Sequence, residues 1–166
     1  MENEAGEARP ASASRISLAI ITEPVHANSF GTIHGGVLLK LADECGAVSA
    51  MRHAGKGQIT TAAIDTFMFL GPVYVGERVD IVAEVSHVGR TSIETRIEIF
   101  AEPYDRPAPR RVAVGYAVYV ALDEEVRRPR PVPPLRIETD TDRLRREEAR
   151  ARQALRRARR AEALRS

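Results

Sequence analysis

Residues 28–48 read Asn28-Ser-Phe-Gly-Thr-Ile-His34-Gly35-Gly36-Val-Leu-Leu-Lys-Leu-Ala-Asp43-Glu-Cys-Gly-Ala-Val48, a polar loop that runs directly into an apolar helix. The Gly35-Gly36 pair leaves backbone N–H groups uncovered by side chains. The first turn of a helix carries unpaired donors and the positive end of the helix dipole. The stretch therefore predicts a helix start that suits an oxygen gaining negative charge.

Asp43 lies inside this predicted helix and is the candidate reactive acid. The residues that share its face by helical spacing are Leu39, Gly46, Ala47 and Ala50. An acid beside small and apolar residues is costly unless it is paired or used. Glu44 falls on another face, four residues after Lys40, and can pair with that lysine in water.

The composition fits one domain with length to spare for a tail. The chain has 166 residues, 43% of them hydrophobic, and a formal net charge of +2. It contains no apolar run of ~18 residues, so we expect no membrane insertion. The acidic start lacks the apolar segment of a signal peptide. The single cysteine, Cys45, allows no intrachain disulfide, is expected to pack in the core, and fits a cytoplasmic location.

The hydrophobic pattern predicts a strand, a long helix and four further strands. The expected segments are a strand over 15–22, a helix over 35–53, and strands over 59–70, 79–88, 92–101 and 111–122. Short links between alternating strands indicate antiparallel hairpins. A helix that is apolar nearly all round is buried on several sides. We therefore expect an α+β fold, with an antiparallel five-stranded sheet wrapped around one long buried helix, whose open edges favour oligomerisation.

The chain divides into four predicted regions. Residues 1–14 read as a disordered N-terminus, 15–126 as the folded domain, 127–139 as a proline-rich linker and 140–166 as an Arg-rich helical tail. In the tail, Asp140-Thr-Asp is expected to cap a helix from about Arg143 to Leu164. The tail holds ten Arg against five Asp or Glu and lacks aromatic residues. It indicates a solvated helix or an oligomer contact, and no nucleic-acid binding.

Three groups of residues carry a resemblance to a known family. They are Asn28…Gly31…His34-Gly35-Gly36…Asp43-Glu44…Gly46-Ala47, then Asp65…Phe69…Pro72-Val73…Gly76, and then Val88-Gly89-Arg90-Thr91-Ser92…Glu94. With them, a region from about residue 16 to 134 resembles the hotdog-fold acyl-CoA thioesterases. Within these enzymes it is most similar to the brain-type or YciA-type acyl-CoA hydrolases.

The resemblance implies a hotdog fold that hydrolyses acyl-CoA at sites between two hotdog domains. Larger relatives carry two such domains, one supplying Asn and the other Asp. Because this chain has both residues in one domain, the resemblance implies that Asn28 and Asp43 meet across an interface in a homodimer, assembled into trimers of dimers. It implies no cofactor, since CoA belongs to the substrate.

Thioester hydrolysis assigns candidate roles to these residues. The N–H groups of Gly35 and Gly36 would hold the developing oxyanion. Asp43 would act as general base on water, or attack directly to form an anhydride. Asn28 would orient the water or the carbonyl.

Substrate binding is expected at two further places. Arg90, with Thr91 and Ser92 on a tight loop, suits the phosphates of CoA. His34 is a further substrate-binding candidate, or it orients its loop through hydrogen bonds. Asp65, in the middle of a strand, is expected to hold a structural hydrogen bond, and no spacing suggests a metal site.

Three alternatives of other classes stay open. A non-catalytic acyl-CoA-binding hotdog protein would keep the pocket and lose turnover. A hotdog hydratase or dehydratase would use His34 and Asp43 as an acid–base pair on carbon. A nucleic-acid or membrane-surface module would use the Arg-rich tail.

Overall fold

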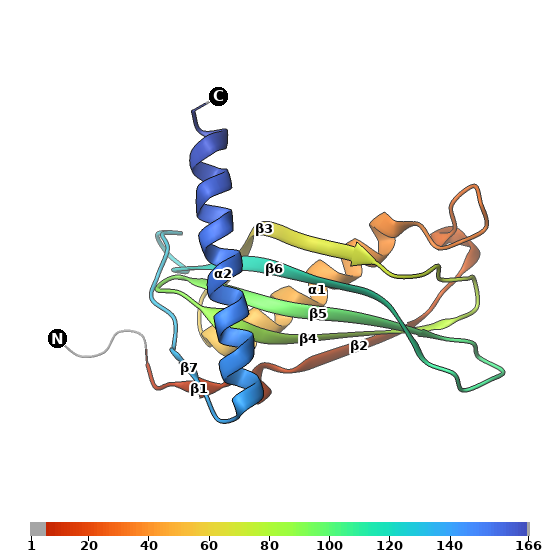
Figure 1. Ribbon diagram of the computed structural model, residues 1–166, viewed down its shortest axis with the longest axis horizontal. Coiled ribbons are helices and arrows are strands. Elements are labelled where there is room, and N and C mark those ends of the chain that lie inside the picture. Colours follow the sequence, from red (N-terminus) through yellow and green to blue (C-terminus); the bar gives the residue numbers. More distant parts are fainter. Residues whose placement is uncertain (1–5, 166) are drawn as a thin grey trace.

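The computed structural model describes residues 6–165 and places a five-stranded sheet between two helices (Figure 1). The elements are β1 (Arg9–Pro10), the 3-10 helix η1 (Ala11–Ser14), β2 (Ile16–Ile21), the 3-10 helix η2 (Pro24–His26), α1 (Gly35–Ala54), β3 (Gln58–Phe69), β4 (Arg78–Val88), β5 (Ser92–Glu102), β6 (Arg110–Leu122), β7 (Leu135–Arg136) and α2 (Asp140–Ala163). In the described part of the chain, neither helix is long and apolar enough to cross a membrane.

The main sheet has the order β2-β4-β5-β6-β3, and every neighbouring pair is antiparallel. The predicted α+β architecture, a five-stranded antiparallel sheet around one long helix with a second helix in the tail, is confirmed. The chain leaves α1 at Gly55, whose φ of +82° suits glycine, and enters β3 at the far edge of the sheet. One long strand edge, that of β3, therefore has no pairing partner among residues 6–165.

The core lies between α1 and the sheet face that carries the alternate buried residues of the central strands. On the sheet these are Val79, Ile81, Ala83, Ile93, Ile97, Ile99, Ala113, Ala117, Tyr119 and Ala121, and on α1 they include Leu38, Ala42, Cys45 and Ala50. Cys45 packs in this core as expected, and burial raises the pKa of its thiol to about 11. The thiol is therefore protonated at neutral pH and is no nucleophile.

Apolar side chains also gather outside the core, along β3 and the adjoining side of α1. Those with 40% or more of their surface exposed are Val48 and Met51 on α1, Ile64, Met68 and Phe69 on β3, and Leu70 directly after it. An unpaired strand edge beside exposed apolar groups is typical of an interface between protein chains.

The N-terminal segment differs from its expectation. The expected disorder of residues 1–14 is wrong for 9–14, and residues 1–5 lie outside the described residues. Ser14 is fully buried, and its Oγ accepts the N–H of Val85 at 2.9 Å. The Arg9 guanidinium donates to the carbonyl of His53, at the C-terminal end of α1, at 2.9 Å. Both hydrogen bonds reach partners far along the chain. The composition of the segment alone therefore could not predict that it is ordered.

The proline-rich segment also packs more closely than a linker. Residues 127–134 form no helix or strand, as their prolines require, but Val132 is 3% exposed and the carbonyl of Pro133 accepts a 2.9 Å hydrogen bond from His53 Nε2. Leu135–Arg136 then pairs in parallel with β1. The segment therefore follows the end of the domain instead of spanning solvent.

Helix α2 begins a few residues before the expected Arg143. Thr139 is its N-cap and forms a capping box with Asp142, since each side chain binds the backbone N–H of the other. The helix crosses the sheet on the face opposite to α1 (Figure 1). It is therefore docked on the domain, and the expected solvated helix is wrong for its sheet-facing side.

Ion pairs hold α2 on this outer face. Arg156 donates to Glu94 at 2.6 Å and to Asp65 at 2.7 Å, and Arg152 donates to Glu94 at 2.8 Å. Glu94 and Asp65 are 1% and 8% exposed at their side chains. The structural role expected for Asp65 is confirmed, as one member of this buried cluster.

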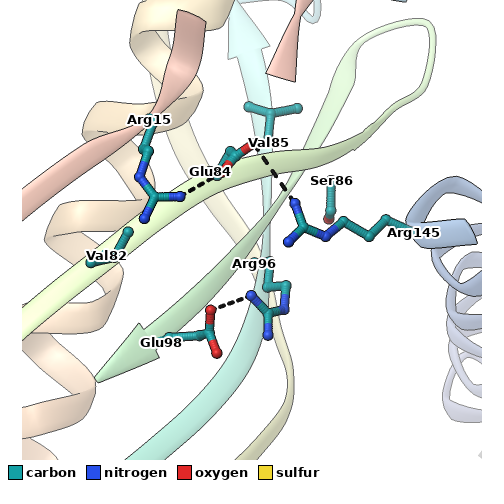
Figure 2. A pocket seen from close by; sticks show the side chains of 8 residues that line it. All are labelled: Arg15, Val82, Glu84, Val85, Ser86, Arg96, Glu98 and Arg145. Atoms are coloured by element: carbon teal, nitrogen blue, oxygen red, sulfur yellow. Dashed lines mark hydrogen bonds and ion pairs between the residues drawn. The ribbon is translucent and has the colours of Figure 1, made fainter. Parts of the chain in front are cut away.

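A second contact of α2 lies nearer its start. Figure 2 shows Arg145 reaching from α2, and Arg15 from the chain before β2, toward Glu84 of β4, at 3.8 and 3.0 Å. Arg96 and Glu98 of β5 pair beside them (Figure 2). This second group is more exposed than the Glu94 cluster, so the cluster is expected to contribute most to the docking.

Replacing Arg156 by methionine tests the anchor. The Arg156→Met variant is expected to lose about 3 kcal/mol of unfolding free energy, because it removes a counter-charge from two buried carboxylates. Arg157→Met, at an exposed position of the same helix, is the matched control and should stay within about 0.5 kcal/mol of the parent. Urea denaturation of both variants measures the difference, and equal midpoints would contradict the anchoring role.

Candidate active site

The loop before α1 is ordered by the side chain of Asn28. Its Oδ1 accepts the N–H groups of Phe30 and Thr32 at 2.9 and 3.2 Å, and its Nδ2 donates to Thr32 Oγ1 at 2.9 Å. Gly31, with a φ of +78°, allows the tight turn between them. Asn28 thus holds the loop in shape, and one N–H of its amide has no partner among the described residues.

His34 is the N-cap of α1. Its Nδ1 accepts the backbone N–H of Gly36 at 2.9 Å. The backbone N–H of His34 donates to the carbonyl of His26, also at 2.9 Å. Among the described residues, nothing accepts the N–H of Gly35. The first turn of the helix therefore offers one free donor at Gly35, while the donor at Gly36 is occupied by the histidine ring.

Asp43 lies two turns further along α1 and is half-buried. Thr61 Oγ1, on β3, donates to its two carboxylate oxygens at 3.0 and 3.3 Å. The hydroxyl of Tyr119, on β6, lies 3.2 Å from Oδ1. Neither Thr61 nor Tyr119 is among the residues that the sequence singled out. The signal available for Tyr119 was its place on the strand face opposite to the valines of β6.

The predicted site residues fall into three separate places within one chain. Asn28, His34, Gly35 and Gly36 lie together at the start of α1. Asp43 follows Gly35 by eight residues, which is about 12 Å along a helix axis. A reacting carbonyl about 3 Å from both groups is therefore impossible in a single chain.

The third place is the β4–β5 turn, which carries Arg90, Thr91 and Ser92. Its carbonyl groups accept N–H groups from Val132 and Ala121, so it lies beside the proline-rich segment. Figure 1 places this turn at the end of the sheet opposite to the start of α1. The Arg90 side chain is exposed and free to reach an anion.

An open apolar groove adjoins the free N–H of Gly35. Its lining includes Ile33, Leu38, Phe69, Leu70 and Val73. The Phe69 ring approaches Gly35 so closely that a Cβ at this glycine would lie 3.1 Å from the ring. The groove therefore runs between the first turn of α1 and the exposed end of β3.

An ion pair fixes the loop on the other side of this groove. Arg110 donates to both carboxylate oxygens of Glu77 at 2.7 Å, and to the carbonyl of Pro72 at 2.8 Å. Glu77 also accepts the N–H of Tyr74 at 2.8 Å. The hydrogen bonds from Arg110 hold the pKa of Glu77 below its ordinary value, so the carboxylate is ionised at neutral pH.

Within residues 6–165, no group of three or more His, Cys, Asp or Glu side chains is placed to hold a metal ion. The chemistry available here consists of a hydrogen-bonded carboxylate, a free backbone donor and an apolar groove. These parts suit attack of an activated water on a polarised carbonyl.

Comparison with known proteins agrees with this arrangement. Residues 30–108 match the model of the thioesterase superfamily. An uncharacterized acyl-CoA thioester hydrolase of Zymomonas mobilis is 32% identical over 125 residues, which cover 75% of this chain and 83% of that protein. The cytosolic acyl coenzyme A thioester hydrolase of Mus musculus is 33% identical over 88% of this chain, and the chain spans 38% of its length.

A solved structure extends the likeness to the whole fold. The crystal structure of an apo-hexameric acyl-CoA thioesterase has a TM-score of 0.87 and 31% sequence identity, over 93% of this chain and 98% of that one. The alignment therefore includes most of α2 as well as the sheet and α1. The resemblance found in the sequence is confirmed, and the chain belongs to the acyl-CoA thioester hydrolases of the thioesterase superfamily, with their hotdog fold.

Proposed function

We propose that the protein hydrolyses acyl-CoA to a free fatty acid and CoA, at sites formed between two copies of the chain. The observation that carries the proposal is Asp43, a half-buried carboxylate held by two hydroxyl groups beside an exposed strand edge. An ionised carboxylate is an acceptor only, so it can take a proton from water. The names of two relatives of this protein, both acyl-CoA thioester hydrolases, support the substrate class.

The separation along α1 supports a shared site. Asp43 and the Gly35 N–H of one chain are too far apart to act on the same thioester, because eight residues of helix separate them. A second copy packed on the exposed apolar surface of β3 and α1 would bring the Asp43 of one chain toward the Gly35 of the other. A homodimer is the smallest unit with complete sites. Trimers of dimers are the proposed assembly, which agrees with the six subunits of the hexameric relative.

The proposed reaction uses the Asp43 carboxylate and the Gly35 N–H. Asp43 removes a proton from water as the water oxygen attacks the thioester carbon. The carbonyl oxygen gains negative charge and accepts a hydrogen bond from the Gly35 N–H. The Gly36 N–H can donate to the same oxygen only when it is released from His34 Nδ1. The carbon–sulfur bond then breaks, the CoA thiolate leaves, and the proton returns from Asp43 to the thiolate or to solvent. Direct attack by Asp43, through an anhydride, is the alternative route.

Substrate contacts follow from the surfaces around these groups. The acyl chain would lie in the apolar groove beside Gly35, which Phe69 and Leu38 line. Arg90, with Thr91 and Ser92, would hold CoA phosphates by charge-assisted hydrogen bonds. Asn28 would orient the water or the carbonyl with its free amide N–H. A cytoplasmic location is proposed because the lone cysteine is a buried thiol and the mouse relative is named cytosolic.

Replacing Asp43 tests the general base. Asp43→Asn keeps the shape of the side chain and removes the proton acceptor, so kcat is expected to fall by about 10²–10⁴-fold. Glu44→Gln is the matched control, because the exposed Glu44 has Lys40 as its one ion-pair partner in the described part of the chain, and it should keep full activity. Thiol release from acyl-CoA, followed with DTNB on oligomers of unchanged size, measures both. Full activity of Asp43→Asn would overturn the assignment.

Mixing two inactive variants tests the shared site. Asn28→Ala and Asp43→Ala protomers, exchanged at equal amounts, should regain roughly a quarter of the parent sites, because half of the dimers are mixed and each has one intact site. Each variant alone, treated in the same way, is the control. If exchange is verified by mass and activity stays at the control level, both residues act within one chain.

A further inference from the structure

Tyr119 lies under the middle of α1 with its hydroxyl at Asp43. The side chain is completely buried, although it ends in a polar group. The hydroxyl lies 3.0 Å from the backbone carbonyl of Asp43 and 3.2 Å from its Oδ1. A phenol that donates to a carboxylate fixes the direction of one carboxylate oxygen.

The tyrosine reaches this position because α1 carries a glycine above it. A Cβ at Gly46 would lie 2.4 Å from the Tyr119 hydroxyl oxygen, and 2.9 Å from both Thr95 Oγ1 and Ile97 Cδ1. Glycine inside a helix costs about 1 kcal/mol relative to alanine. Local helix stability therefore gives no reason for glycine here, whereas the space needed by the Tyr119 hydroxyl does.

The hydroxyl keeps its proton in this environment. Burial, and then the negative charge of Asp43, raise the pKa of Tyr119 above its ordinary value. The groups around it are Asp43, Thr95 and the Cys45 thiol, which burial keeps protonated. Tyr119 therefore keeps its single O–H proton throughout the neutral range and shares it between the backbone carbonyl and Oδ1 of Asp43.

We propose that Tyr119 is a positioning residue, which acts through Asp43 and holds its carboxylate toward the reacting water, and that Gly46 is the space this contact requires. The inference rests on the proposed function of Asp43 as general base. Thr61 holds the carboxylate from the exposed side of β3, and Tyr119 holds it from the core. Two donors from different strands restrict rotation of the carboxylate, so Oδ2 keeps a constant direction toward the reacting water.

Tyr119→Phe tests the contact, because phenylalanine keeps the ring and removes the hydroxyl. We expect kcat to fall about tenfold, the loss of one hydrogen bond to a charged group, while KM changes less than about twofold. The loss should appear in kcat and not in KM, because Tyr119 contacts the carboxylate and not the substrate. A merely structural role would lower the melting temperature and leave kcat of the folded enzyme unchanged.

Tyr116→Phe is the matched control on the same strand. Tyr116 points to the other face, under the Arg152 guanidinium of α2, 3.6 Å from its ring centroid. This variant should leave kcat and KM unchanged. Gly46→Ala gives an independent check of the packing. It should lower kcat about tenfold, and adding Tyr119→Phe should restore part of the lost melting temperature, because the closest clash is removed.

The outcomes separate this inference from the proposed function. A folded Tyr119→Phe enzyme with parent kcat overturns the positioning role, while an inactive Asp43→Asn enzyme still supports hydrolysis through Asp43. If Asp43→Asn is itself fully active, the proposed function fails and Tyr119 has no general base to position.

Discussion

The close approach of α1 to the sheet is the constraint on which the rest of the structure depends. Small residues make it possible, among them Ala42 and Gly46 on the helix and Ala83 and Ala117 on the strands. A helix that is apolar nearly all round needs cover on more than one side, and the sheet covers only one. The uncovered side adjoins the unpaired edge of β3. The packing that forms the core therefore also creates the surface on which the proposed shared sites depend.

The main elements could be predicted from the sequence because their signals are local. The helix expected over 35–53 runs over Gly35–Ala54, and the strand expected over 59–70 runs over Gln58–Phe69. Alternation, apolar runs and terminal glycines determine these bounds. The segments that were misjudged, β1, η1 and the docked face of α2, depend on partners far along the chain. An ion pair such as that of Arg156 with Asp65, 91 residues apart, leaves no mark in a local pattern.

The candidate site shows the same division. Spacing alone placed Asp43 on a buried face and the glycines at a helix start, but it could not tell which glycine has a free N–H. His34 occupies the donor of Gly36, and this depends on the rotamer of one side chain. Tyr119 was not among the predicted site residues, because nothing in its local sequence ties a strand tyrosine to the helix. A contact between strand and helix, 76 residues apart, becomes visible only when the register of the sheet is known.

The ion cluster beneath α2 makes the C-terminal helix and two residues of the sheet mutually dependent. Without the helix, Glu94 and Asp65 would be neighbouring negative charges on a bare sheet, and without those acids the helix would lose its anchor. Neither half can be lost alone without a penalty. A chain shortened before the helix would replace a buried ion-pair network with two hydrated acids that repel each other, so its sheet would lose the stability that the network provides.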